Sequence, residues 1–193
     1  MALLEQALEN SKNWIANGEF FAKLSSLVNI ITDSKNSLSS EDLASYYTDG
    51  LSDILTELGL QTEIIDNPIK NGPPFLIGER IESSEFNTIL LYGHGDTVPL
   101  QDGQWLEEII PNELKIIDNK IYGRGVADNK GQHLVNLLAL LSVLKIRKKL
   151  GFNLKIVFEM GEEIGSPGLF ELCEKYKDYF KSDVLIASDG PRV

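Results

Sequence analysis

Residues 88–97 have the sequence TILLYGHGDT and predict a buried strand that delivers His94 and Asp96 to its carboxyl end. The apolar run Ile89–Leu91 is typical of a strand inside a sheet, and the neighbouring glycines let other backbone approach closely. Open α/β sheets hold their chemistry at the carboxyl ends of strands. Asp96 lies on the same side of an extended chain as His94, so it could orient the imidazole ring. A histidine satisfied inside a tight turn would explain the same residues.

The order of elements predicts an α/β fold. After residue 88 the pattern alternates strand, helix, strand, helix and strand, which favours a mixed, mostly parallel sheet flanked by helices on both faces. No repeat, low-complexity tract or linker divides residues 1–193, so we expect a single domain. The expected elements are helices over 2–31 (broken near 17–18), 39–58, 131–148 and 167–180, strands over 61–65, 75–81, 88–92, 153–159 and 184–187, and a hairpin over 114–122.

Composition narrows the class of protein. The apolar fraction of 42% is ordinary for a soluble domain, and the net charge of −11 argues against nucleic acid as a partner. Cys173 is the sole cysteine, which excludes an internal disulfide and fits a reducing compartment; we expect it to be half-buried on a helix. The longest apolar stretch, Leu134–Leu144, is too short to span a bilayer, and no signal peptide opens the chain. We therefore expect a cytoplasmic protein with no membrane partner.

Three further acidic segments follow the predicted strands. Asp128 comes after a Gly-Arg-Gly segment without the glycine spacing of a nucleotide loop, and it could simply cap the next helix. Glu162 and Glu163 could form a solvated turn, or one could bind a metal while the other takes a proton from water. Asp189 follows the last strand. Together with His94, these carboxylates fall on one side of the sheet, and such ligands without a thiolate suit zinc, cobalt or manganese.

With these motifs in place, the chain resembles the N-terminal catalytic half of the zinc aminoacylase/carboxypeptidase family, which includes carnosine-type dipeptidases. The matching stretches occur in the family's order and cover roughly residues 85–190: LLYGHGDTVP, IYGRGVADNKGQ, FEMGEEIGSPG and LIASDGP. Aspartate rather than glutamate at position 189, and the tail from Ser188 to Arg192, look more like the peptidase branch than the deacylase branch.

The resemblance implies a role for each site residue. One zinc ion would be bound by His94 and Asp189, a second by Glu163, and both by Asp128, while Glu162 would be the general base and Asp96 would orient His94. Two Zn²⁺ ions per full-length site, with Co²⁺ or Mn²⁺ possible, would assist attack of water on an amide carbonyl. The substrates would be dipeptides or other small N-acyl amino acids.

The chain also departs from the family. Members run to roughly twice this length, have a histidine ligand near their C-terminus and carry a lid domain that dimerises. His133 is expected to pack near the site rather than replace that ligand. We therefore expect residues 1–193 to be the N-terminal part of a catalytic domain, inactive alone, within a full-length homodimer. Two alternatives remain: an inactive domain that binds one metal ion or a partner, and a metal-free acidic interaction domain.

Overall fold

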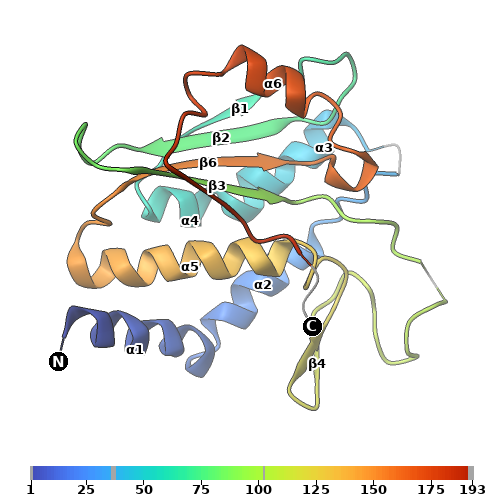
Figure 1. The fold of residues 1–193 in the computed structure, drawn as a ribbon. Coiled ribbons are helices and arrows are strands. Elements are labelled where there is room, and N and C mark those ends of the chain that lie inside the picture. The colour runs from blue at the N-terminus through green and yellow to red at the C-terminus, as the bar shows by residue number, and fades with distance from the viewer. Residues whose placement is uncertain (1, 36–37, 102, 191–193) are drawn as a thin grey trace.

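A five-stranded sheet forms the centre of the computed structural model, which describes residues 2–35, 38–101 and 103–190 (Figure 1). The strands, in their order across the sheet, are β1 (Gln61–Ile65), β2 (Phe75–Arg80), β6 (Asn153–Glu159), β3 (Thr88–His94) and β7 (Val184–Ala187). The pairings of β1 with β2 and of β2 with β6 are antiparallel, whereas β3 is parallel to both β6 and β7. The expected mixed sheet is confirmed, and its parallel part contains the strand that ends in His94.

Helices cover both faces of the sheet (Figure 1). Beneath the sheet in this view lie α1 (Leu3–Ala16), α2 (Glu19–Asn29), α4 (Ser52–Glu57) and α5 (Lys130–Arg147), and above it lies α6 (Leu169–Lys175). Successive strand residues face opposite sides of the sheet. Ile156 therefore joins the large core between the sheet and α5, and Val157 joins the smaller core between the sheet and α6. The near-continuous apolar runs of β3 and β6 are therefore explained by burial on two faces.

Several sequence expectations hold at the level of single residues. The first helical segment breaks at Gly18, whose φ of 82° lies in the left-handed region that glycine tolerates. The side chain of Ser39 accepts a hydrogen bond from the Asp42 amide and so caps α3 (Ser40–Ser45). The expected hairpin is formed by β4 (Lys115–Ile117) and β5 (Lys120–Tyr122).

Two helices differ from expectation. The segment expected as one helix over 39–58 contains a wider π-helical turn, η1 (Tyr46–Leu51), between α3 and α4. The helix expected to reach residue 180 ends at Lys175, because Tyr179 is held by the sheet instead. Its hydroxyl donates to the Gly78 carbonyl at 2.6 Å, and its own carbonyl accepts from Lys155 Nζ at 2.5 Å. Tertiary contacts thus override local helix propensity.

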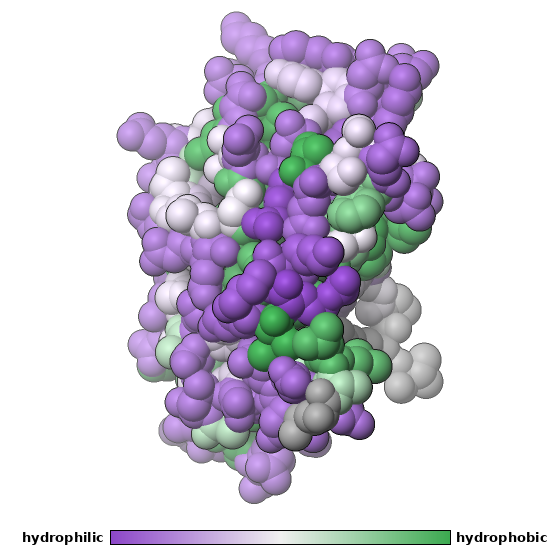
Figure 2. All heavy atoms as spheres, turned by 90° about the vertical axis from the view of Figure 1, so that its left-hand side faces the viewer, coloured by the Kyte–Doolittle hydropathy of each residue, from purple (hydrophilic) through white to green (hydrophobic). Residues whose placement is uncertain are grey.

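The two ends of the sheet differ in character. The surface at the end where α5 finishes is mainly hydrophilic (Figure 2). The last turn of α5 carries Lys145 and Arg147, whose positive charges suit a helix C-terminus. The opposite end, where β3 and β6 finish, carries the acidic segments. No helix among the described residues is long and apolar enough to cross a membrane.

Gly131, at the start of α5, packs closely against the backbone of Val126, and this contact should matter for stability. A Cβ atom added at Gly131 would overlap the carbonyl oxygen of Val126, so Gly131→Ala must shift the loop that precedes α5. We expect a loss of about 1–3 kcal/mol in the free energy of unfolding, measured by urea denaturation. Gly190→Ala is the control, because a Cβ there meets nothing within 4 Å. Equal stability of the two variants would contradict the tight contact.

Candidate metal centre

His94 ends β3 and is completely buried. Its Nδ1 atom lies 3.1 Å from the Asp96 carbonyl oxygen and 3.2 Å from Asp96 Oδ1. Both neighbours are acceptors, so Nδ1 must carry a proton and donate it. Nε2 is therefore the nitrogen that faces the site. The expected pairing of Asp96 with His94 is present in the structure.

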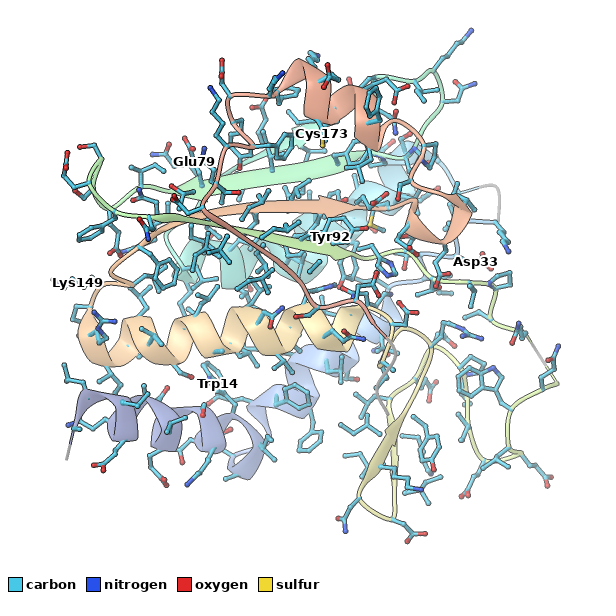
Figure 3. The ribbon with its side chains drawn as sticks, viewed as in Figure 1. Trp14, Asp33, Glu79, Tyr92, Lys149 and Cys173 are labelled. Carbon is cyan, nitrogen blue, oxygen red and sulfur yellow. The ribbon has the colours of Figure 1, made fainter. Side chains whose placement is uncertain are left out.

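Carboxylates from three other segments surround Nε2 of His94. The nearest oxygens are Asp128 Oδ1 at 2.9 Å, Asp189 Oδ2 at 3.5 Å and Glu162 Oε2 at 4.0 Å. His94, Glu162 and Asp189 each offer one ligand atom within 4.8 Å of the others, the one such group of three found in the part of the chain that the structure describes. Residues far apart in sequence thus converge around His94, two residues beyond Tyr92 on β3, which Figure 3 labels.

Asp96 does more than orient the imidazole ring. Its Oδ1 atom accepts the backbone N–H of Glu162 and its Oδ2 atom accepts that of Glu163, both at 3.1 Å. These amides belong to a short 3₁₀ turn, η2 (Glu162–Ile164), which begins three residues after the end of β6. One buried carboxylate therefore fixes both the His94 ring and the turn that carries the two glutamates. The sequence pattern gave no signal of this second contact.

Glu163 is held apart from the carboxylates around His94. The group within 4.8 Å contains Glu162 but not its neighbour, because consecutive side chains of a 3₁₀ turn point roughly 120° apart. Burial, followed by the negative charge of Asp128, raises the pKa of Glu163. Glu163 therefore lies within the electrostatic influence of Asp128.

Competing effects set the charge of His94. Burial alone would lower its pKa, but the hydrogen bond and charge of Asp96, with the charges of Asp189 and Asp128, raise it to about 9. At neutral pH without a metal the ring is an imidazolium, and its Nε2 proton points at carboxylate oxygens. Burial raises the pKa of Glu162, the charge of His94 opposes that rise, and the carboxylate of Asp189 adds to it.

These donors fit a divalent cation. Imidazole nitrogen and carboxylate oxygen are ligands of zinc, cobalt and manganese, and two ligands of a tetrahedral zinc ion lie roughly 3.4 Å apart. The separation of 3.5 Å between His94 Nε2 and Asp189 Oδ2 matches that spacing. Because Asp96 holds Nδ1–H, a cation would take the place of the Nε2 proton. The cluster of carboxylates would then be neutralised by more than one positive charge.

Two buried residues near the site were not predicted from the sequence. Glu159 pairs with His94 in the β3–β6 register, and its Oε1 atom accepts from the Tyr92 hydroxyl at 2.7 Å and from Ser166 Oγ at 2.9 Å. The parallel register could have indicated Glu159, because residues that end adjacent parallel strands lie side by side. Asn129 is also buried, and its contacts depend on chain segments that no local pattern connects. His133 packs inside the protein, as expected, and is completely buried.

A cavity of about 760 Å³ adjoins the site. Its lining includes the carboxylate residues Asp128, Glu162 and Asp189 and apolar residues such as Phe20 and Ile121. The tail from Ser188 to Arg192 is described only as far as Gly190, so Pro191 and Arg192 lie outside the described residues.

Comparisons with known proteins identify relatives. Residues 90–192 match the family model of peptidase family M20/M25/M40. Beta-Ala-His dipeptidase from Mus musculus is 37% identical over 149 residues, covering 72% of this chain and 30% of that protein. Cysteinylglycine-S-conjugate dipeptidase from Corynebacterium striatum is 36% identical over 141 residues, again 72% of this chain and 30% of that protein. The chain thus spans about a third of the length of these curated relatives.

A solved structure is similar across the whole chain. The crystal structure of human carnosine dipeptidase 1 superposes with a TM-score of 0.83 and 30% sequence identity. The superposition covers 100% of this chain and 42% of that one. The mixed sheet with helices on both faces is therefore the arrangement seen in a solved dipeptidase.

The electrostatics of the site predict opposite titrations for the two histidines. Burial, with the positive charges of His94 and Lys130, lowers the pKa of His133 to about 3, whereas that of His94 is about 9. In the metal-free chain, nuclear magnetic resonance of the ring nitrogens should show His94 losing its proton near pH 9. His133 should remain neutral from pH 5 upward. Titration of both rings near the ordinary value of 6.5 would contradict the described environment.

Proposed function

The chain belongs to peptidase family M20/M25/M40, and from that premise we propose that it supplies the metal-binding part of a hydrolase that cleaves amide bonds of small peptides or N-acyl amino acids. The observation that carries this proposal is the convergence of His94 Nε2 with the oxygens of Asp128, Asp189 and Glu162. Most specifically, we propose a zinc-dependent, dipeptidase-like exopeptidase. Residues 1–193 would form the N-terminal part of its catalytic domain.

We propose the metal ligands that the family resemblance implies. His94 and Asp189 would hold one zinc ion, Glu163 a second, and Asp128 would bridge them, with cobalt or manganese as possible replacements. The distances from His94 to Asp128 and Asp189 support the first ion, and the electrostatic coupling of Glu163 to Asp128 supports the second. An alternative proposal is that this chain alone binds a single ion, through the group formed by His94, Glu162 and Asp189, and is inactive.

The chain's own residues would divide the chemical work. A bound divalent metal polarises an amide carbonyl and makes water a better nucleophile. Asp96 keeps the proton on Nδ1 of His94, so that Nε2 offers its lone pair, and also holds the backbone of Glu162 in place. Glu162, whose pKa is raised, would accept a proton from the attacking water and deliver it to the leaving nitrogen.

Relatives and cavity size support small peptides as substrates. The mouse relative is named for the dipeptide β-Ala-His and the Corynebacterium striatum relative for cysteinylglycine conjugates. A cavity of about 760 Å³ beside the acidic cluster is in the range that holds a small ligand. N-acyl amino acids share the same scissile amide, so carboxypeptidase or deacylase activity belongs to this proposal. We also propose a cytoplasmic location, which the single unpaired Cys173 supports, and a homodimer for the whole protein.

Metal titration tests the site directly. We expect the chain to bind zinc tightly and His94→Ala to lose that binding, with Cys173→Ser as a control that removes a thiol but no proposed ligand. Because the His94 pKa is about 9, zinc binding at pH 7 should release about one proton, and affinity should rise roughly tenfold per pH unit up to pH 9. Calorimetry in buffers of different ionisation enthalpy measures this release. Unchanged binding by His94→Ala would rule out the proposed centre.

Substitution of the general base tests the chemistry. In protein expressed from the complete gene and loaded with zinc or manganese, Glu162→Gln should lower kcat for dipeptide hydrolysis by about 10²–10⁴-fold. Metal affinity should change far less. Glu171→Gln, on the exposed side of α6, is the matched control and should leave kcat unaltered. A Glu162→Gln enzyme with full activity, or an unaltered enzyme that cleaves no member of a panel of dipeptides and N-acyl amino acids, would refute the assignment.

A further inference from the structure

Asp189 reaches the site from a weakly supported strand. All four residues of β7 are exposed, and this edge strand pairs with β3 alone. The recorded register ends at the pair Tyr92 and Ala187, before Asp189 is reached. Beyond that point the strand ladder no longer fixes where the chain lies. Something else must keep the Asp189 carboxylate 3.5 Å from His94 Nε2.

Side-chain amides of α5 and its cap hold the segment that precedes Asp189. Asn129 Nδ2 donates to the Ser188 carbonyl at 2.7 Å, and Asn136 Nδ2 donates to Ser188 Oγ at 2.8 Å. Asn129 is only 1% exposed, so the donor side of this hydrogen bond is buried. The peptide group that directly precedes Asp189 is therefore attached to a buried side chain rather than to the sheet.

The oxygen of the same amide binds the other elements of the site. Asn129 Oδ1 accepts the backbone N–H of His94 at 3.4 Å and lies 3.1 Å from His133 Nδ1. Asn129 also directly follows Asp128 in the chain. The side chain of Asn129 thus contacts the segments that carry His94 and Asp189, and its backbone is joined directly to Asp128.

Hydrogen-bond chemistry fixes the orientation of this amide. Because Nδ2 must donate to Ser188, Oδ1 faces His133, whose Nδ1 must then carry the proton. His133 Nε2 is left to accept from the Tyr46 hydroxyl at 2.6 Å. A flip of the Asn129 amide would place Oδ1 against the Ser188 carbonyl oxygen and Nδ2 against the His94 N–H, so that acceptor would face acceptor and donor would face donor.

We propose that Asn129 is a positioning residue that holds the Ser188–Asp189 segment and the end of β3 in one frame, and so sets the distance between Asp189 and His94. The inference rests on the proposed metal centre. In this role Asn129 acts through Ser188 and the His94 backbone. Groups that orient metal ligands in this way typically alter metal affinity by roughly 10–100-fold when they are removed.

The test compares two buried asparagines. Asn129→Ala should weaken zinc binding roughly 10–100-fold, measured by competition with a chromophoric chelator, and should change the visible spectrum of bound cobalt. Asn153→Ala is the matched control: Asn153 is 4% exposed and makes a comparable set of hydrogen bonds near the start of β6. It should lower thermal stability without altering zinc affinity. If Asn129→Ala does not fold, Asn129→Asp keeps the shape and the acceptor oxygen but lacks the N–H that Ser188 requires.

The outcomes separate this proposal from the metal centre itself. Zinc affinity unchanged in the Asn129 variant, or weakened equally in Asn153→Ala, overturns the positioning role while the metal centre stands. Equal zinc binding by the unaltered chain and His94→Ala overturns the metal centre. Crystal structures of the metal-free chain and the Asn129 variant then test whether Asn129 sets the distance between His94 and Asp189. The separation of His94 Nε2 and Asp189 Oδ2 should change by more than about 0.5 Å, and an unchanged separation overturns the proposal.

Discussion

The buried carboxylate of Asp96 is the contact on which the acidic site depends. It accepts from the imidazole of His94 at the end of β3 and from two backbone amides that follow β6. Because β3 and β6 are parallel, their carboxyl ends lie at the same edge of the sheet and one side chain can reach both. Replacement of this carboxylate by an apolar group would remove the acceptor of the Glu162 and Glu163 backbone amides and would leave His94 Nδ1 with the Asp96 backbone carbonyl alone. A donor that loses its acceptor inside the protein costs more than the loss of one exposed hydrogen bond.

Concentrated negative charge is the second constraint. Asp96, Asp128 and Asp189 approach a single imidazole ring, and the hydrogen bond to Asp96 together with the three charges outweighs the effect of burial on the His94 pKa. One imidazolium charge balances this field only in part. A divalent cation would balance it better and would release the proton from Nε2. The concentrated negative charge that destabilises the metal-free cluster therefore favours metal binding. A bound cation would offset the repulsion between carboxylates that lie so close together.

Polar contacts inside the protein connect the site to the helices. Lys130 is buried and donates to the carbonyls of Leu27 and Ile30 at the end of α2. Asn129, its neighbour, reaches the end of β3 and the segment after β7. The start of α5 thus ties the N-terminal helices to the edge of the sheet. An edge strand with exposed side chains can in this way deliver a carboxylate to a defined place.

The sequence by itself determined the strands, since the apolar runs of β3 and β6 require burial on two faces. It placed His94, Glu162, Glu163 and Asp189 at or just after strand ends, and Asp128 just before helix α5. It also gave the break at Gly18 and the cap at Ser39, because both effects act within one turn. Tertiary structure alone decided that helix α6 stops at Lys175, that Asp96 binds the Glu162 turn, and that Asn129 joins His94 to Ser188. Those contacts link residues far apart in the chain, and their geometry exists only after the sheet has brought the strand ends together.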